Sequence, residues 1–470
     1  MNFVLDRRKW LFTGVPLGLN CLRFNSSIGS ANQVNSVKQI TRNAPGFNKA
    51  KSVLIVYTGG GMSQYESWDP KPTAPAEIRG EFSSIATSVP GIRIGEYLPL
   101  TAKWMSKLCL IRSMTHDDLD HGSASYLALT GQFHSRKSSN PPISPNDHPS
   151  MSAVLRKLRV PPIGSHVAVH LNGPLIAPIL PSAGQNGGFL GRAYEPMILG
   201  DVRESDQLPN HLLDDQQMPA VRLDSRKKLM DQLEHFQQKY NQSKEFNDYS
   251  ETTKQAFHLL GNKRYLKAFD LSEESEKLKD RYGRDRSGQA CLLARRLIEI
   301  GIPLVIVFLN HGIRGQDRSK EVDDFGWDTH NDIFEMMKNH LLPHFDRSFS
   351  TLVSDLSQRG LLDSTLLMCM GEFGRAPLVA LEKTFAGSSP GRKHWAACYS
   401  IVAAGAGVQG GTVYGASDQR GAYPQDKPTT PADVIATIFN SLGIDPSGHF
   451  EDPFSRPYPI STGKPIQGLF

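Results

Sequence analysis

The sequence predicts an α/β fold built on a mostly parallel sheet with helices on both faces. Continuous apolar, β-branched runs at residues 52–57, 303–309 and 364–370 are typical of strands that are buried on both faces. The helical pattern at residues 289–300 stops at Gly301 and leads directly into the second of these strands. Such a helix-to-strand unit is the connection that joins parallel strands.

The other elements follow from the same periodicities. Three further strands are expected at residues 108–113, 167–171 and 399–404. Helices are expected from about residue 97 to 108 and at residues 123–131, 152–159, 333–359 and 431–442, with a break at Pro343. The charged segment at about 222–280 has a helical period, which predicts a helical insertion with a solvated face.

The first 31 residues resemble a twin-arginine export signal. Arg7 and Arg8 precede an aromatic residue and a leucine, and a modest apolar stretch follows over residues 11–22. Small residues suited to signal-peptidase cleavage come next. This interpretation predicts export to the periplasm or the cell exterior, and a basic N-terminal arm is the alternative.

Residues 32–50 are polar and unpatterned, which indicates a linker. The remaining chain, residues 51–470, is expected to form a single α/β domain that contains the helical insertion.

The composition excludes several classes of protein. The 470 residues include 52 Lys and Arg and 47 Asp and Glu, a net charge of +5 without a basic block, so nucleic-acid binding is not expected. No apolar run reaches transmembrane length, so no stable membrane insertion is expected. The five cysteines form no CxxC pair, and neither a zinc knuckle nor a dense disulfide framework is indicated.

Polar side chains follow four strand or near-strand ends, and His394 adds a fifth element. The four groups are Ser63, Glu66 and Asp69; His116, Asp117, Asp120 and His121; Asp328 and His330; and Glu372 and Arg375. Ligands of α/β sheets bind outside the carboxyl ends of the strands. Carboxylate and imidazole groups from several strand ends are suitable ligands for a divalent cation.

Each group alone has a simpler interpretation. An Asp-x-His pair such as Asp328 and His330 is often a hydrogen-bonded surface pair, and Glu372 with Arg375 matches a local ion pair. His121 beside a glycine is compatible with a helix cap. The glycines at residues 59–61 either bring backbone N–H groups to an anion or form a tight turn. The joint placement at strand ends favours the metal site.

The chain resembles the DUF1501 proteins, a bacterial family abundant in planctomycetes and placed with the alkaline phosphatase/sulfatase-like superfamily. The resemblance rests on ordered stretches that include GGGMSQYESWDPKPTAPAEIRGEF, IRSMTHDDLDHGSASYLALTG, GWDTHNDIF, GEFGRAP, GRKHW and GGTVYGASDQRG. It implies an alkaline-phosphatase-like three-layer sandwich. Two departures stand out: Thr58 and Gly59 end the first strand where the phosphatases have an Asp ligand, and His121 stands where Ser or Thr is expected.

The resemblance implies an exported, metal-dependent hydrolase of sulfate or phosphate esters. The substrate would be a small molecule or a polysaccharide, and the metal Zn²⁺, Mn²⁺, Mg²⁺ or Ca²⁺. The expected metal ligands are Asp328, His330, Glu372, His394 and Asp69. The expected catalytic groups are His121 or Ser123, as nucleophile or proton-transfer group, and Arg375 as a substrate clamp; Ser63 and His116 are expected to contact substrate. The alternative is a non-catalytic protein of the same fold that binds anionic polysaccharide.

The export signal predicts a defined effect of a conservative change. Replacing Arg7 and Arg8 by Lys keeps the charge, and we expect it to retain the protein in the cytoplasm because the twin-arginine signal is read as an arginine pair. Cell fractionation measures this. Equal export of the variant and the unaltered protein would favour the basic-arm alternative.

Overall fold

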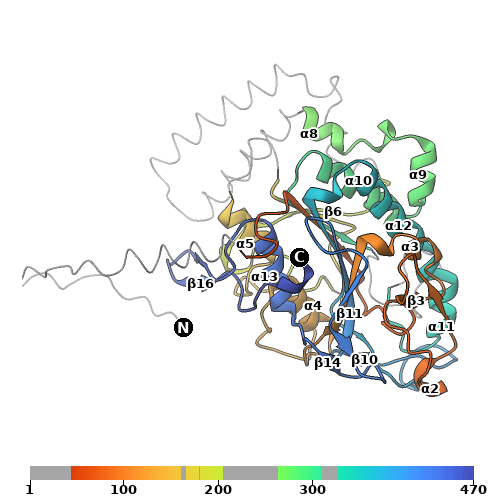
Figure 1. Ribbon diagram of the computed structural model, residues 1–470. Helices are drawn as coiled ribbons and strands as arrows, with labels where there is room; N and C mark the ends of the chain where they lie inside the picture. Colours follow the sequence, from red (N-terminus) through yellow and green to blue (C-terminus); the bar gives the residue numbers. More distant parts are fainter. Residues whose placement is uncertain (1–43, 160–165, 179, 205–262, 310–325) are drawn as a thin grey trace, which may run out of the picture. The chain divides into compact units, whose positions relative to one another are not determined.

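An eight-stranded sheet organises the described part of the chain (Figure 1). The computed structural model describes residues 44–159, 166–178, 180–204, 263–309 and 326–470. The expected signal and most of the expected linker and insertion lie outside these ranges. The strand order is β12-β4-β11-β8-β1-β7-β5-β6. Their bounds are β1 (Ser52–Tyr57), β4 (Leu108–Met114), β5 (Ala168–Leu171), β6 (Met197–Leu199), β7 (Leu304–Phe308), β8 (Thr365–Met370), β11 (Tyr399–Ala404) and β12 (Thr412–Tyr414).

The sheet is mostly parallel, which confirms the predicted class. Strand β1 pairs in parallel with β7 and β8 at the centre, and β5 continues the parallel pairing outward from β7. Strand β11 is antiparallel to both of its neighbours, β4 and β8. The start of β11 therefore lies at the edge where the parallel strands end, which we call the carboxyl edge.

Helices pack on both faces of the sheet. Alternate residues of β1 point to opposite sides, because Leu54 and Val56 belong to one apolar core and Val53 and Ile55 to the other. The first core includes residues of α10 (Arg286–Glu299) and α12 (Leu342–Gln358); the second includes residues of α4 (His121–Thr130), α5 (Met151–Leu158) and α13 (Pro431–Ser441). The predicted three layers are thus present.

The helix around Pro343 is interrupted as predicted. Helix α11 (Ile333–Met336) passes into a π-helical segment, Met337–Leu341, before α12 begins at Leu342. Proline lacks a backbone N–H group, and the wider π turn accommodates this loss at the start of α12.

One predicted helix is replaced by shorter elements. The stretch expected to be helical from about residue 97 to 108 contains α3 (Pro99–Ala102) and the 3₁₀ helix η1 (Met105–Lys107). The other described α-helices and small strands are α2 (Ala76–Arg79), α8 (Lys263–Ala268), α9 (Glu276–Tyr282), β2 (Ser84–Ala86), β3 (Arg93–Gly95), β9 (Gly374–Arg375), β10 (His394–Trp395), β13 (Ala416–Ser417), β14 (Pro424–Asp426), β15 (His449–Glu451) and β16 (Pro457–Pro459). Among the described helices, none has both the length and the apolar character needed to span a membrane.

A buried ion pair between Glu66 and Arg392 connects the loop after β1 with the segment before β10. The Arg392 guanidinium donates to Glu66 Oε1 from Nε at 3.1 Å and from Nη2 at 2.8 Å, and both side chains are fully buried. Arg392 also donates to backbone carbonyl groups, those of Ile78, Ala376 and Pro377. Ser63 donates to the second oxygen of Glu66. A carboxylate with this many donors is stable in its buried position.

Removal of this guanidinium should destabilise the fold. Arg392→Met keeps much of the side-chain volume but leaves Glu66 buried without its counter-charge, so we expect a loss of about 3–5 kcal/mol in the free energy of unfolding. Urea denaturation measures it. Arg284→Met is the control, because Arg284 and its partners Glu276 and Asp280 are all exposed, so the change should alter stability little. An Arg392→Met protein as stable as the control would contradict this role.

Candidate metal centre

Four side chains meet at the carboxyl edge of the sheet. His121 opens α4 after β4, Asp328 and His330 come after β7, and His394 lies in β10 just before β11. Two backbone contacts help to place them: Trp327 N–H donates to the carbonyl oxygen of Gly59 at 3.2 Å, and β10 pairs with β9 beside the end of β8. The edge therefore gathers residues from distant parts of the chain.

Oδ1 of Asp328 is the common point of these side chains. It lies 3.2 Å from Nε2 of His121 and 3.1 Å from Nε2 of both His330 and His394. Nε2 of His330 is 2.9 Å from Nε2 of His394. Three imidazole nitrogens and one carboxylate oxygen thus point at one small region.

Glu372 holds His121 from the opposite side of its ring. Nδ1 of His121 donates to Glu372 Oε1 at 2.7 Å, and the N–H of Gly60 donates to the same oxygen at 2.7 Å. Glu372 is fully buried. A carboxylate on one ring nitrogen orients the imidazole and leaves the other nitrogen for a metal. The glycine turn after β1 therefore does bind an anion, and that anion is the carboxylate of the protein's own Glu372.

The other two histidines are held by a carbonyl group and an aromatic ring. Nδ1 of His394 donates to the carbonyl oxygen of Leu119 at 2.7 Å, which leaves Nε2 to face Asp328. The ring of His330 stacks on Phe385 with 3.7 Å between centroids and 7° between planes. Phe373 packs against the rings of both His121 and His394, at 4.8 and 4.6 Å. These contacts fix the direction of each imidazole.

Arg375 is bound by the protein rather than free for a substrate. Its guanidinium is fully buried and donates to Asp328 Oδ1 at 2.8 Å, to the carbonyl oxygen of Gly61 at 2.9 Å and to that of Arg392 at 3.2 Å. The prediction that Arg375 binds substrate is therefore wrong, because these contacts occupy its guanidinium. Arg375 instead neutralises and positions Asp328.

Charges at the centre shift the pKa values of its members. Burial opposes ionisation of Asp328, but His121 and Arg375 outweigh it and hold the pKa of this carboxyl well below its usual range. Burial alone would lower the pKa of His121, yet Asp328 and Glu372 raise it to about 9. Burial, with the His121 charge, lowers the pKa of His394 to about 3, and burial also lowers the pKa of His330. In the absence of a cation, positive charge is therefore favoured at His121, next to Asp328.

The loop after β1 does not bring its polar side chains to this cluster. Asp69 forms ion pairs with Lys71 at 3.0 Å and Arg112 at 3.4 Å and accepts from Ser417. Ser63 donates to Glu66, as described above. Within the described residues, neither side chain contacts any of the four that converge, so the structure separates Asp69 from the expected ligand set.

Ser123 and His116 are also engaged elsewhere. Oγ of Ser123 donates to Asp118 Oδ1 at 2.7 Å, and the serine is fully buried. Nδ1 of His116 accepts from the N–H of Asp118 at 3.1 Å, so Nε2 carries the hydrogen and donates to the carbonyl oxygen of Glu372 at 2.6 Å. Because burial lowers its pKa, His116 is a neutral residue that holds the end of β8.

The donor set suits a divalent cation. His121, Asp328 and His394 each offer a ligand atom, all within 4.8 Å of one another, and Nε2 of His330 lies against two of them. Nε2 of His121 is buried and makes no hydrogen bond to a described residue, although Asp328 Oδ1 is 3.2 Å away. Imidazole nitrogens with one carboxylate oxygen are typical ligands of Zn²⁺ and related ions.

A family model matches most of the chain and shows which protein family it belongs to. The model described as "Protein of unknown function (DUF1501)" matches residues 50–470. The chain belongs to the DUF1501 family. No curated protein matches the chain.

Several solved structures resemble this DUF1501 protein at low identity. The phosphonate monoester hydrolase SpPMH from Silicibacter pomeroyi is 11% identical, with 89% of this chain and 76% of that chain covered and a TM-score of 0.41. The PsFucS1 sulfatase from Pseudoalteromonas sp. is 12% identical, with 88% and 70% covered and a TM-score of 0.37. A protein of the alkaline phosphatase superfamily from Vibrio parahaemolyticus is 10% identical, with 86% and 69% covered and a TM-score of 0.36. Likenesses of this size carry no conclusion about activity.

The contacts that orient the three histidines could not be predicted from sequence patterns. The carbonyl group of Leu119 and the N–H group of Gly60 carry no signal, because every residue but proline has both. Phe373 lies between Glu372 and Gly374 in the sequence GEFGRAP. An apolar residue among polar ones was the only sequence signal that it packs against the site. Phe385 lies in a loop without a pattern.

Metal affinity should fall in graded steps when the centre is altered. We expect one divalent cation per chain, lost in Asp328→Asn because the shared carboxylate is removed. Glu372→Gln keeps all four donor side chains but removes the charge behind His121, so the affinity should fall by about 10–100-fold. Equilibrium dialysis against Zn²⁺ or Mn²⁺, followed by metal quantification, measures both.

His449→Asn is the matched control, since His449 is an exposed histidine in β15. Unchanged metal content in Asp328→Asn, or the same loss in the control, would contradict the assignment of the centre.

Proposed function

We propose that this DUF1501 protein is an exported, metal-dependent hydrolase that cleaves sulfate or phosphate esters. The single observation that carries the proposal is the convergence of three imidazole nitrogens on Oδ1 of Asp328, within 3.2 Å, at the carboxyl edge of an α/β sheet. A site that were only a hydrogen-bonded surface pair would need neither three histidines nor a carboxylate behind one of them.

In the proposal, His121, Asp328, His330 and His394 hold the cation. A divalent cation bound there would act as a Lewis acid on an ester oxygen. Glu372 keeps His121 in the tautomer with Nε2 free, and Arg375 balances the charge of Asp328. Phe373 packs against the ring of His121, and Phe385 stacks on the ring of His330.

The substrate would approach from the side of His394. Among the four side chains, His394 is the most exposed at 18%, against 12% for Asp328, 6% for His330 and 4% for His121. An anionic ester suits a position that already favours positive charge, since a cation there would attract the ester oxygens.

Water is the proposed attacking group. The expected protein nucleophiles are engaged in other contacts: Ser123 donates to Asp118, and both ring nitrogens of His121 face carboxylates. Hydrolysis by water requires no covalent intermediate on the protein. Ser123 in this proposal instead supports the first turn of α4, which carries His121.

One observation favours the alternative, a non-catalytic protein that binds anionic polysaccharide. Among the described residues, no serine or threonine hydroxyl group contacts the four converging side chains, and the loop after β1 supplies no second carboxylate to them. A cation held by four protein side chains would then have a structural role. Turnover distinguishes the two proposals.

The hydrolase proposal predicts metal-dependent turnover of simple esters. We expect hydrolysis of p-nitrophenyl sulfate or p-nitrophenyl phosphate after incubation with a divalent cation, and loss of that activity on chelation. Asp328→Asn should lower kcat/KM by about a hundredfold or more, because the cation stabilises the transition state by several kcal/mol.

His449→Asn should keep full activity. Protein that holds the cation and turns over neither ester would contradict the hydrolase proposal and support the binding protein.

A further inference from the structure

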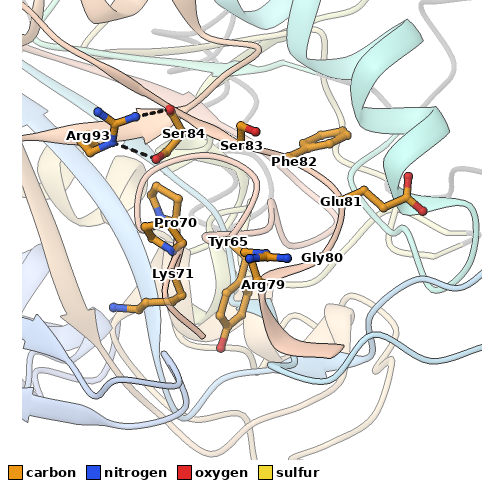
Figure 2. A pocket seen from close by; sticks show the side chains of 11 residues that line it. Tyr65, Pro70, Lys71, Arg79, Gly80, Glu81, Phe82, Ser83, Ser84 and Arg93 are labelled. Carbon is orange, nitrogen blue, oxygen red and sulfur yellow. Dashed lines mark hydrogen bonds between the residues drawn. The ribbon is translucent and has the colours of Figure 1, made fainter. Parts of the chain in front are cut away.

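A polar pocket lies between the loop after β1, α2 and the β2–β3 hairpin (Figure 2). Its volume is about 380 Å³, within the size range of small-ligand sites. The polar residues that line it include Lys71, Arg79, Glu81, Ser83 and Arg93. None of these belongs to the metal centre described above.

Positive charge is in excess in this pocket. Three of its lining residues are cationic, Lys71, Arg79 and Arg93, and Glu81 is its one acidic lining residue. Lys71 pairs with Asp69 at 3.0 Å, but Asp69 is also 3.4 Å from Arg112, so one carboxylate serves two cations. The pocket therefore retains a positive field that a bound anion would balance.

Arg79 is the cation best placed to take a ligand. It is exposed in the last turn of α2, and its guanidinium makes no hydrogen bond or ion pair to another residue in the described ranges. Arg93 is partly engaged: Nε donates to Ser84 Oγ at 2.9 Å and Nη2 donates to the carbonyl oxygen of Ser84. These bonds hold Arg93 on the pocket wall and leave Nη1 for an acceptor.

The rest of the wall combines rings with polar groups. The ring of Tyr65 lies under the Arg392 guanidinium at 4.4 Å, and its hydroxyl group donates to the carbonyl oxygen of Arg420 at 2.7 Å. Phe82 packs on Tyr97 and Phe334, at 4.6 and 5.3 Å between centroids. These rings are engaged within the protein, whereas Glu81 and Ser83 are exposed beside them and offer a carboxylate and a hydroxyl group, which suits a ligand rich in hydroxyl groups.

One short segment connects the pocket with the metal centre. Ser417 accepts from Lys71 at 2.7 Å, and Arg420 accepts from Tyr65, as described above. Ala422 accepts from Nε1 of Trp395 at 2.7 Å, and Trp395 follows His394 directly. The ring centroids of Trp395 and Tyr423 lie 5.9 Å apart, and the Tyr423 side chain is exposed. The segment from residue 416 to 423 thus has contacts at both places.

We propose that this pocket binds an oxyanion group, sulfate or phosphate, carried by a polyanionic saccharide. Arg79 and Arg93 receive the anion, and Ser83, Ser84 and Glu81 face the hydroxyl groups of the sugar. Guanidinium groups bind such oxyanions through paired N–H donors. This site goes beyond the hydrolase proposal, because its binding does not require turnover at the metal centre.

Calorimetric titration of the full chain at low ionic strength tests the proposal. The probes are a heparin hexasaccharide, the same hexasaccharide without its sulfate groups, and tripolyphosphate. We expect the sulfated hexasaccharide to bind and its desulfated counterpart to bind at least about tenfold more weakly, because the charge-assisted bonds are lost. Comparison with tripolyphosphate tells whether sulfate or phosphate is preferred.

Arg79→Ala is the central variant because it breaks no hydrogen bond or ion pair within the described residues. We expect it to weaken binding of the sulfated hexasaccharide by about tenfold, and Arg79→Ala with Arg93→Ala to weaken it further. The double variant Arg281→Ala, Arg284→Ala removes the same formal charge at α9 and just after it, outside the pocket, and should change the affinity by less than about twofold.

Three results would overturn the proposal: no binding of the sulfated probe, equal binding of the desulfated one, or equal losses in both double variants. Asp328→Asn separates this site from the metal centre, because it should keep hexasaccharide binding. Ester turnover by a protein that fails to bind the hexasaccharide would reject the pocket and leave the hydrolase proposal standing.

Discussion

The ion pair between Arg375 and Asp328 is the interaction on which the carboxyl edge depends. Arg375 is fully buried, and it ties Asp328 to the carbonyl groups of the glycine turn after β1 and to Arg392. Asp328 in turn is the point to which His121, His330 and His394 are directed. The buried Asp328 carboxylate remains ionised because the Arg375 guanidinium and the imidazoles offset the cost of burying its charge.

The topology of the sheet explains why these residues meet. The parallel strands β1, β7 and β8 all end at the carboxyl edge, so the loops that follow them lie there. Strand β11 runs antiparallel to β8, so the residues that precede β11 lie at the same edge. His394 comes late in the chain and lies in no loop after a parallel strand. It reaches the centre because β10 pairs with β9 immediately after β8.

The sequence predicted the central strands well, because a buried strand is a local pattern. Continuous apolar runs mark the central strands. His121, Asp328 and His330 follow strands in the sequence, whereas His394 precedes β11. The roles within the site depended on contacts that no local pattern records. The carboxylate of Glu372 accepts from both Gly60 N–H and His121, and Arg375 donates to a carbonyl group of the glycine turn. Asp69 looked equally suitable in sequence, yet Lys71, Arg112 and Ser417 hold it elsewhere.

The central claim is that the four converging side chains bind one divalent cation. An anomalous-scattering map of crystals grown with Zn²⁺ or Mn²⁺ tests this most directly. The account predicts one strong peak within coordinating distance, about 2.0–2.2 Å, of Nε2 of His121, His330 and His394 and of Oδ1 of Asp328. Side chains that remain in contact with one another while the map is empty at this position, or a peak held by other residues, would contradict it.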